Sequence, residues 1–300
     1  MTATIIDGSR VAEAIRGEVN QQVQELKREQ GIVPGLAVVL VGDNPASAAY
    51  VRGKARACTE VGIDSITVRP PADVTQAELL KVVWDLNNDP RYHGILVQLP
   101  LPSHIDEAAV LEAISPDKDV DGLHSHNMGK LLKGEGELFP CTPAGVQQLL
   151  VRSGYSPEGK HVVICGRSNL VGKPLAALLV QKRRAANATV TICHTGTRDL
   201  PGITRQADIL VAAMGSAGSI TAEMVSPHTV VVDVGINRVA DAASKTGYRL
   251  VGDVDFDVVR EKVAAITPVP GGVGPMTIAM LLVNTVRAAR SQATHGSHRP

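Results

Sequence analysis

Residues 161–174 read HVVICGRSNLVGKP and join a strand, a glycine loop and a helix in one short run. The apolar, β-branched segment 161–165 predicts a buried strand, and an apolar helical pattern follows the loop. Gly166 and Gly172 bound a connection of the kind that places backbone N–H groups and the positive end of a helix dipole at one point, which suits a phosphate. The spacing differs from G-x-G-x-x-G because Ser168 stands at the middle position, so a purely structural strand-to-helix turn remains an alternative.

The same alternation of strand and helix extends over almost the whole chain. Predicted helices cover residues 9–29, 46–61, 75–88, 106–114, 143–152, 173–184 and 275–291, and predicted strands cover 35–41, 63–69, 94–99, 161–165, 188–193, 208–213, 229–234 and 264–269. Strands separated by helices predict a parallel sheet with helices on its faces. Two such series, joined through a predicted loop over 115–142, indicate two α/β domains with a cleft between them, the second being a Rossmann-like dinucleotide-binding domain.

The two series also set the predicted domain boundaries. The first domain is expected to comprise residues 1–145 and the second residues 146–274. The helix over 275–291 is apolar nearly all round, so we expect it to be buried and to pack back on the first domain, which it completes. The polar, aperiodic residues 292–300 predict a disordered tail.

The end of the strand over 188–193 indicates which dinucleotide binds. NAD sites usually place an acid there for the ribose 2′-hydroxyl, but residues 194–198 read HTGTR and contain none. Together with Arg167 on the glycine loop, these hydroxyls and cations favour a 2′-phosphate and therefore NADP. Two later strands end in Ala213-Met214-Gly215 and Val234-Gly235-Ile236, and open α/β sheets bind ligands at such strand ends.

The first domain supplies a candidate proton-transfer group. Tyr50 and Lys54 lie four residues apart on a predicted helix and share a face, where a partly desolvated lysine can move protons. An exposed lysine over a packed tyrosine remains the alternative. Gln98 closes an apolar parallel strand and therefore lies at the ligand edge of the sheet. Asp121 belongs to a DKDVDG run in the long loop, and the sequence does not distinguish it from the other acids of that run.

The Tyr-x-x-x-Lys spacing also occurs in short-chain dehydrogenases. Those enzymes place their glycine loop near the N-terminus and the Tyr/Lys pair well after it. Here Lys54 precedes Gly166 by over a hundred residues, and this reversed order excludes that family.

A second glycine-rich loop, at residues 270–277, reads PGGVGPMT and runs directly into the last predicted helix. Glycine lets a backbone approach a ligand closely, and Pro275 suits the first turn of a helix. The run therefore predicts a rigid ligand-binding loop, with a tight connection that binds nothing as the alternative.

Composition excludes several classes of function. The formal net charge is zero and aromatic residues make up 2% of the chain, which gives no indication of a nucleic-acid partner. No apolar run approaches the ~20 residues of a membrane span, and the N-terminus lacks a signal-peptide pattern. The four cysteines have no C-x-x-C spacing and indicate reduced thiols in a cytoplasmic protein. The histidines show no metal-ligand spacing, so no metal is expected.

Taken together, these segments resemble the family of bifunctional methylenetetrahydrofolate dehydrogenase/methenyltetrahydrofolate cyclohydrolases (FolD) from about residue 4 to residue 290. The matching pieces are residues 50–54 (YVRGK), 78–102 with its VQLP run, 118–122 (KDVDG), 166–172 (GRSNLVG) and 270–277 (PGGVGPMT). The resemblance implies NADP-dependent oxidation of 5,10-methylenetetrahydrofolate to the 5,10-methenyl form, followed by hydrolysis to 10-formyltetrahydrofolate at the same site. The alternative is a monofunctional dehydrogenase with weak cyclohydrolase activity, because the same residues serve both steps.

The resemblance also assigns roles to particular residues. The expected catalytic residues are Lys54, Tyr50, Gln98 and Asp121, with Lys54 moving the proton in the hydrolysis and Asp121 binding the pterin ring. The expected folate-binding residues are Tyr50, Val51, Arg52, Gly53, Lys54, Val97, Gln98, Leu99, Asp121, Pro270, Gly271, Gly272, Val273 and Gly274. The expected NADP-binding residues are Gly166, Arg167, Ser168, Thr195 and Ile236, Thr195 standing where some relatives carry serine. Family members are typically homodimers, so the resemblance implies a homodimer that acts on a small-molecule folate.

Overall fold

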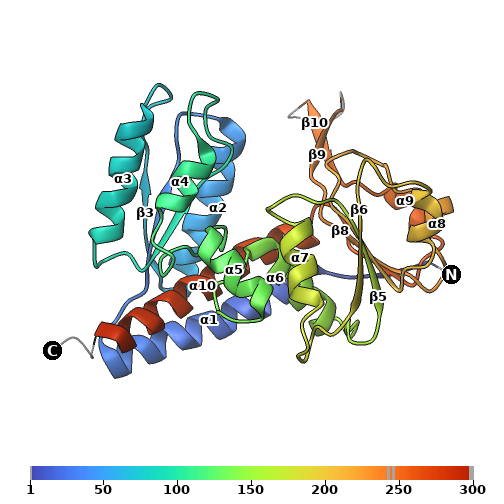
Figure 1. Ribbon diagram of the computed structural model, residues 1–300, viewed down its shortest axis with the longest axis horizontal. Coiled ribbons are helices and arrows are strands. Elements are labelled where there is room, and N and C mark those ends of the chain that lie inside the picture. Colours follow the sequence, from blue (N-terminus) through green and yellow to red (C-terminus); the bar gives the residue numbers. More distant parts are fainter. Residues whose placement is uncertain (1, 242–243, 245–246, 297–300) are drawn as a thin grey trace. The chain divides into compact units, whose positions relative to one another are not determined.

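The computed structural model describes residues 2–241, 244 and 247–296, which form two compact α/β units (Figure 1). One unit contains Thr142–Thr277 together with the start of the chain up to Ala12. The other contains Glu13–Cys141 together with the segment that begins at Ile278. The predicted α/β class with two domains is confirmed. None of the described helices is long and apolar enough to cross a membrane.

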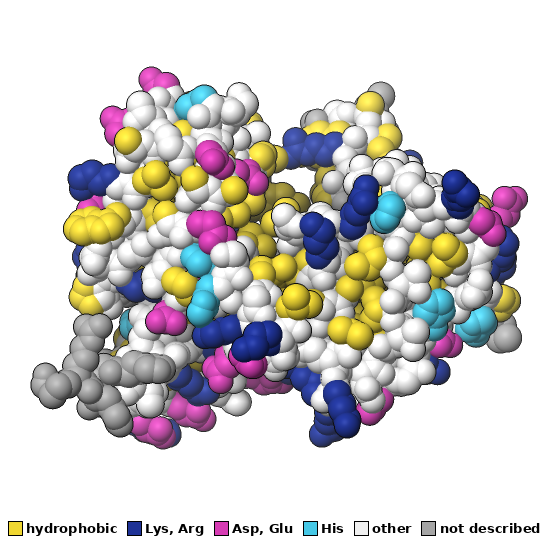
Figure 2. All heavy atoms as spheres, viewed as in Figure 1, with side chains coloured by type: hydrophobic (Ala, Val, Ile, Leu, Met, Phe, Trp, Pro, Cys, Tyr) yellow, Lys and Arg dark blue, Asp and Glu magenta, His cyan; other side chains and the backbone are white. Residues whose placement is uncertain are grey.

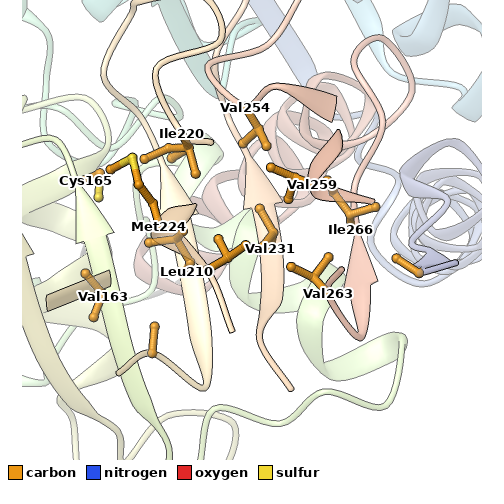
Figure 3. Packing of buried hydrophobic residues seen from close by; sticks show 14 of the residues in the cluster. Val163, Cys165, Leu210, Ile220, Met224, Val231, Val254, Val259, Val263 and Ile266 are labelled. Atoms are coloured by element: carbon orange, nitrogen blue, oxygen red, sulfur yellow. The ribbon is translucent and has the colours of Figure 1, made fainter. Parts of the chain in front are cut away.

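The unit containing Thr142–Thr277 is built on a six-stranded sheet in the order β1-β11-β8-β7-β5-β6, in which every paired strand is parallel. Its strands are β1 (Thr4–Ile5), β5 (His161–Cys165), β6 (Thr189–Cys193), β7 (Ile209–Ala212), β8 (Val230–Asp233) and β11 (Ala265–Ile266). Aliphatic runs form these strands because a parallel sheet is covered on both faces. In neighbouring strands Val163, Leu210, Val231 and Ile266 lie side by side and project into one apolar core (Figure 3).

Short helices and one hairpin complete this unit. They are α6 (Cys141–Arg152), α7 (Gly172–Leu179), α8 (Leu200–Thr204), the 3-10 helix η1 (Ala222–Met224), α9 (Phe256–Val259), and the antiparallel strands β9 (Asn237–Ala240) and β10 (Tyr248–Val251). Helix α7 ends at Leu179, before the predicted residue 184, and the positive φ angles of Ala185 and Asn187 exclude any helix across those two residues. The hairpin and the shorter helices were not predicted, because such short runs show no readable periodicity.

The unit containing Glu13–Cys141 is built on a three-stranded parallel sheet in the order β3-β2-β4. Its strands are β2 (Gly35–Val39), β3 (Asp64–Val68) and β4 (Gly94–Val97), and its helices include α2 (Pro45–Val61), α3 (Gln76–Asn88), α4 (Glu107–Ala113) and α5 (Ser125–Lys133). Helix α3 begins with a capping box between Thr75 and Glu78. Its apolar face, with Leu79 and Val83, packs on Ile95 of the sheet in one buried cluster.

Two long helices carry the chain from one unit to the other: α1 (Gly8–Gln30) and α10 (Val273–Gly296). Helix α10 is buried along most of its length, as its apolar sequence predicts. Beyond Ile278 it packs on the unit of the three-stranded sheet, where the Asn284 amide donates hydrogen bonds to the carbonyls of Val120 (2.9 Å) and Phe139 (2.8 Å). The predicted packing of the last helix on the first domain is confirmed.

Three further predictions differ from the structure. Helix α5 lies within the predicted loop over 115–142. Strand β1 adds to the edge of the six-stranded sheet, so residues 2–12 belong with that sheet and not with the first domain. The predicted disorder is wrong for residues 292–296, which are helical, since the Gln292 amide donates to the carbonyls of His93 (2.8 Å) and Asp117 (3.0 Å). The rest of the predicted tail lies outside the described residues.

Charged side chains are mixed over the face that Figure 2 shows. Figure 2 shows Lys and Arg side chains interspersed with Asp and Glu on the visible face, without one large area of a single sign. This distribution agrees with a formal net charge of zero, and such a face exerts no strong long-range attraction on a polyanion.

Candidate active site

Lys54 lies on the inner face of helix α2. Asn44 caps the start of this helix by accepting two backbone N–H hydrogen bonds. Val51, Lys54 and Cys58 follow at helical spacing and share the buried face, which leaves Lys54 only 9% exposed. Its Nζ donates a hydrogen bond to Oε1 of Gln98 at 3.0 Å. A buried ammonium or amine with a polar partner is the arrangement that a proton-transfer lysine requires.

Gln98 is fixed in one orientation at the end of strand β4. Its backbone N–H donates to the carbonyl of Val39 at 2.9 Å, which continues the pairing with β2 by one residue. Its side-chain Nε2 donates to the carbonyl of Leu99 at 2.8 Å. Because the amide nitrogen is engaged there, the amide oxygen is the atom that faces Lys54. The prediction that Gln98 lies at the carboxyl edge of this sheet is confirmed.

The remaining residues of the YVRGK run take different environments. Tyr50 lies one turn before Lys54 and its side chain is 44% exposed, while Arg52 is exposed on the outer side of the helix. Val51 is 1% exposed, so it stabilises the helix against the core and offers little surface to a ligand. Gly53 is half-buried. Of these residues, Tyr50 is therefore accessible to a substrate and Val51 is not.

The structure of the DKDVDG loop shows which of its acids is accessible to a ligand. The Asp119 carboxylate is buried and accepts hydrogen bonds from the N–H groups of Gly122 (3.1 Å), Leu123 (3.2 Å) and His124 (2.9 Å), and from the amide of Asn127 (2.8 Å). Burial nevertheless raises the pKa of Asp119 above its usual value. Asp119 is thus committed to the loop, whereas the half-buried Asp121 two residues later stays accessible.

Cys141 carries a buried thiol whose pKa responds to the charges of both Lys54 and Asp121. This thiol is buried, and its Sγ donates to the carbonyl of Val120 at 3.2 Å. Burial raises its pKa well above the usual value, the negative charge of Asp121 raises it further, and the positive charge of Lys54 lowers it. The charges of Lys54 and Asp121 therefore both act on this thiol. Cys141 was not predicted near the site, because its neighbours in the chain are not site residues.

The glycine loop of the other unit packs closely on neighbouring backbone. Gly166 has φ +135°, and a Cβ atom built on it would lie 2.1 Å from the carbonyl oxygen of Ala213. A Cβ atom on Gly172 would lie 2.1 Å from the carbonyl oxygen of Gly166. Arg167 and Ser168 are exposed on this loop, and no side chain caps the start of helix α7. A tight loop, a cation and an uncapped helix start fit a dinucleotide phosphate.

The end of strand β6 fits a phosphorylated ribose better than a ribose hydroxyl. The turn after the strand is fixed by hydrogen bonds from the His194 N–H to Oγ1 of Thr197 (2.8 Å) and from the Gly196 N–H to Nδ1 of His194 (3.0 Å). Thr195 is exposed on that turn. The first acid after the strand is Asp199, and its carboxylate accepts the Gly202 N–H (3.0 Å) at the start of α8. The turn itself therefore offers hydroxyl and cationic groups, as NADP requires.

The PGGVG loop follows strand β11 and leads directly into helix α10, as predicted. Gly271 has φ +105°, and its carbonyl accepts the Ser9 N–H at 3.1 Å. A Cβ atom on Gly8 would lie 1.8 Å from the carbonyl oxygen of Gly272, so the start of α1 packs directly on this loop. Pro270 is exposed, whereas Val273 is buried in the first turn of α10. This loop belongs to the unit of the six-stranded sheet, and the residues around Lys54 belong to the other.

The strand ends that precede the hairpin carry exposed apolar side chains. Ile236 follows strand β8 and Met214 follows strand β7, and both are exposed at the carboxyl edge of the sheet. Over the described part of the chain, no group of three or more His, Cys, Asp or Glu side chains is arranged to hold a metal ion.

Comparison with known proteins agrees with this geometry. Residues 6–121 match the family model "Tetrahydrofolate dehydrogenase/cyclohydrolase, catalytic domain", and residues 140–293 match "Tetrahydrofolate dehydrogenase/cyclohydrolase, NAD(P)-binding domain". The chain is 57% identical to the bifunctional protein FolD of Dehalococcoides mccartyi, over 97% of this chain and 98% of the relative.

Solved structures show the same fold. The FolD enzyme of Campylobacter jejuni is 48% identical, with a TM-score of 0.90 over 97% of this chain and 99% of that one. The FolD of Trypanosoma brucei, solved with NADP cofactor and an inhibitor, is 43% identical, with a TM-score of 0.91 over the same shares of the two chains. The chain belongs to the tetrahydrofolate dehydrogenase/cyclohydrolase family.

Proposed function

We propose that this protein oxidises 5,10-methylenetetrahydrofolate to the 5,10-methenyl form with NADP and then hydrolyses that form to 10-formyltetrahydrofolate at the same site. The match to both domains of the dehydrogenase/cyclohydrolase family supports the two activities. The relative solved with NADP, together with the acid-free turn after β6, supports NADP as the cofactor. The observation that carries the proposal is the buried, hydrogen-bonded pair of Lys54 and Gln98.

The oxidation needs orientation more than acid–base catalysis. NADP, when bound, accepts the hydride that leaves the methylene carbon of the folate. No proton moves in this step, so the protein contributes by holding the two reactants in a productive geometry. We assign Gly166, Arg167 and Ser168 to the cofactor phosphates, Thr195 to the 2′-phosphate and Ile236 to the nicotinamide side.

The hydrolysis does need proton transfer. Water adds to the cationic carbon between N5 and N10 of the methenyl form, and one proton must leave that water as the new C–O bond forms. The bond from that carbon to N5 then breaks as the new hydroxyl loses its proton and becomes the C=O of the formyl group. Of the two protons that the water has given up, N5 takes one and the solvent takes the other, which leaves the formyl group on N10. Lys54 is the group placed to move the proton, because it is buried and its Nζ is oriented by Gln98.

Asp121 orients the folate. A pterin ring presents an amino group and a ring N–H along one edge, and a carboxylate accepts both hydrogen bonds at once. Asp121 is half-buried and two residues from the anchored Asp119, so its backbone is held while its carboxylate remains accessible. The remaining folate contacts are assigned to residues 50, 52, 53, 97–99 and 270–274.

We also propose that the protein works in the cytoplasm as a homodimer. All four cysteines are buried free thiols, which suits a reducing compartment. The dimer rests on the family resemblance, and sedimentation equilibrium of the purified protein tests it: twice the chain mass supports a dimer, and the chain mass alone contradicts it.

The function is tested by following purified protein spectrophotometrically with 5,10-methylenetetrahydrofolate, in parallel with NADP and with NAD. Reduction of NADP in preference to NAD, followed by loss of the methenyl product faster than in buffer, is the expected result. Accumulation of the methenyl product would leave only the dehydrogenase activity, and no reduction with either cofactor would contradict the proposal as a whole.

A further inference from the structure

A fully buried carboxylate lies behind the carboxyl edge of the six-stranded sheet. Asp253 is 0% exposed, and its Oδ2 accepts the backbone N–H groups of Met214 and Gly215 (2.9 Å). Its Oδ1 accepts the Ser216 N–H at 2.9 Å and the Asn237 side-chain amide at 2.8 Å. Three successive backbone N–H groups on one anion form a nest, and here the anion is supplied by the protein itself.

A second carboxylate holds Asp253 in place. Asp233, at the end of strand β8, accepts the N–H groups of Gly235, Asp253 and Val254, each at 2.9 Å. The two glycines of this region leave room for the acids: a Cβ atom on Gly235 would lie 2.3 Å from Cγ of Asp253, and one on Gly252 would lie 1.8 Å from Oδ2 of Asp233. Val254 also belongs to the apolar core shown in Figure 3, which anchors this segment from the other side.

Asp253 thus joins two turns that are far apart in the sequence. The Met214–Ser216 turn follows strand β7, and Asn237 follows Ile236 after strand β8. Met214 and Ile236 are exposed at the edge where parallel sheets bind ligands. Asp253 itself is inaccessible and its oxygens are occupied, so it cannot act by touching a ligand.

We propose that Asp253 is a positioning residue for the nicotinamide half of the cofactor, because it fixes the turns that carry Met214 and Ile236 at one edge of the sheet. This proposal rests on the proposed NADP-dependent function. It adds a role for a buried residue remote in sequence from the glycine loop at Gly166.

The Asp253→Asn variant tests the proposal because N–H donors face both oxygens of the Asp253 carboxylate. Each carboxylate oxygen accepts two hydrogen bonds, so an amide NH₂ in either orientation would face two N–H donors. We expect calorimetric titration to show NADP binding weakened by about tenfold or more, because hydrogen bonds to a charged acceptor are lost. Hydrolysis of the methenyl substrate without NADP should stay within about twofold of wild type, since Lys54 belongs to the other unit and the Asp253 oxygens bond to the turns at 214–216 and Asn237 rather than to the folate-binding loop at 270–274.

Asp208→Asn is the matched control. Asp208 precedes strand β7 at the opposite edge of the same sheet, and its Oδ2 accepts the His161 N–H at 2.9 Å. An amide oxygen can keep that single bond, so NADP affinity should remain at the wild-type level. Gly235→Ala is the second test variant, because its Cβ would displace the Asp253 side chain without removing the charge. It should weaken NADP binding in the same way if Asp253→Asn does not fold.

The outcomes separate this proposal from the function on which it rests. Weakened NADP binding with intact hydrolysis in either test variant supports it. Wild-type NADP affinity in a folded test variant overturns the proposal. An equal loss of NADP binding and hydrolysis in both test variants also overturns it, because such a loss indicates a general structural role. If wild-type protein itself binds no NADP, the proposed cofactor is wrong and this proposal falls with it.

Discussion

Replacing Lys54 with methionine should separate the two activities. Methionine keeps an unbranched stem of similar volume in the buried face of α2 but removes the proton-transfer group and the hydrogen bond to Gln98. Proton transfer by a positioned side chain contributes about 10²–10⁴-fold to a rate. Hydrolysis of the methenyl substrate should therefore fall by about 10²–10⁴-fold, whereas hydride transfer, which moves no proton, should fall by less than about tenfold.

The same change affects stability, and a control must account for it. Loss of the Lys54 donor leaves the amide oxygen of Gln98 without this partner, which lowers the free energy of unfolding by about 1–3 kcal/mol. Lys118 is the matched control, because it is 8% exposed in the same unit and its Nζ donates to the carbonyls of Leu86 (3.1 Å) and Asp89 (2.8 Å). Lys118→Met should lower stability similarly but leave the ratio of the two activities unaltered.

Both activities are measured on one preparation, the first as NADP reduction with the methylene substrate and the second as hydrolysis of the methenyl substrate. Denaturant unfolding of each variant checks that the protein is folded. A parallel loss of both activities in folded Lys54→Met would refute the assignment of Lys54 to proton transfer, as would an equal change of the ratio in Lys118→Met.

Three further predictions follow from buried polar groups. Asp119→Ala should raise the KM for the folate by about tenfold, because the anchored backbone beside Asp121 is released, while NADP affinity stays at the wild-type level; an unaffected folate KM would contradict this. Burial raises the pKa of Asp233 to about 6, so the folded state binds a proton more tightly than the unfolded state, and this group's contribution to the free energy of unfolding should fall by about 3 kcal/mol as pH rises from about 4 to about 6. In urea unfolding measured at several pH values, Asp233→Asn should remove this decrease in the free energy of unfolding. An identical pH dependence in both proteins would exclude Asp233 as its source. The four buried thiols, with burial raising the pKa of Cys58 and Cys165 to about 12, should react with an alkylating reagent only after denaturation; rapid labelling of native protein would contradict their burial.

The sequence predicts those parts of the fold that rest on long, regular patterns. The strand at His161–Cys165 has the predicted bounds, and the strands and helices of both series occur in the predicted order. Helix α5 was missed because it lies in a polar, glycine-containing region and is fixed by side-chain contacts outside the helix, such as that of Asn127 with Asp119, which periodicity does not show. The tail was misjudged for the same reason, since Gln292 bonds to carbonyls far away in the chain.

The site was predictable where one segment carries its own chemistry. Lys54 and Gln98 stand out by spacing and position, and the structure joins them by a hydrogen bond. Sequence alone does not separate Asp119 from Asp121, because the difference lies in which carboxylate the surrounding N–H groups occupy. Cys141 was likewise not predictable as part of the site, since only the folded chain brings it to Lys54 and Asp121.

The claim that one site performs both reactions is tested most directly with a non-reactive tetrahydrofolate analogue. Its inhibition constant is measured for the dehydrogenase and for the cyclohydrolase on the same preparation, with NADP at the same concentration in both assays. If Lys54 and Asp121 belong to one folate site, the analogue competes in both assays with the same constant within about twofold. Complete inhibition of one activity while the other continues unaffected would contradict a shared site.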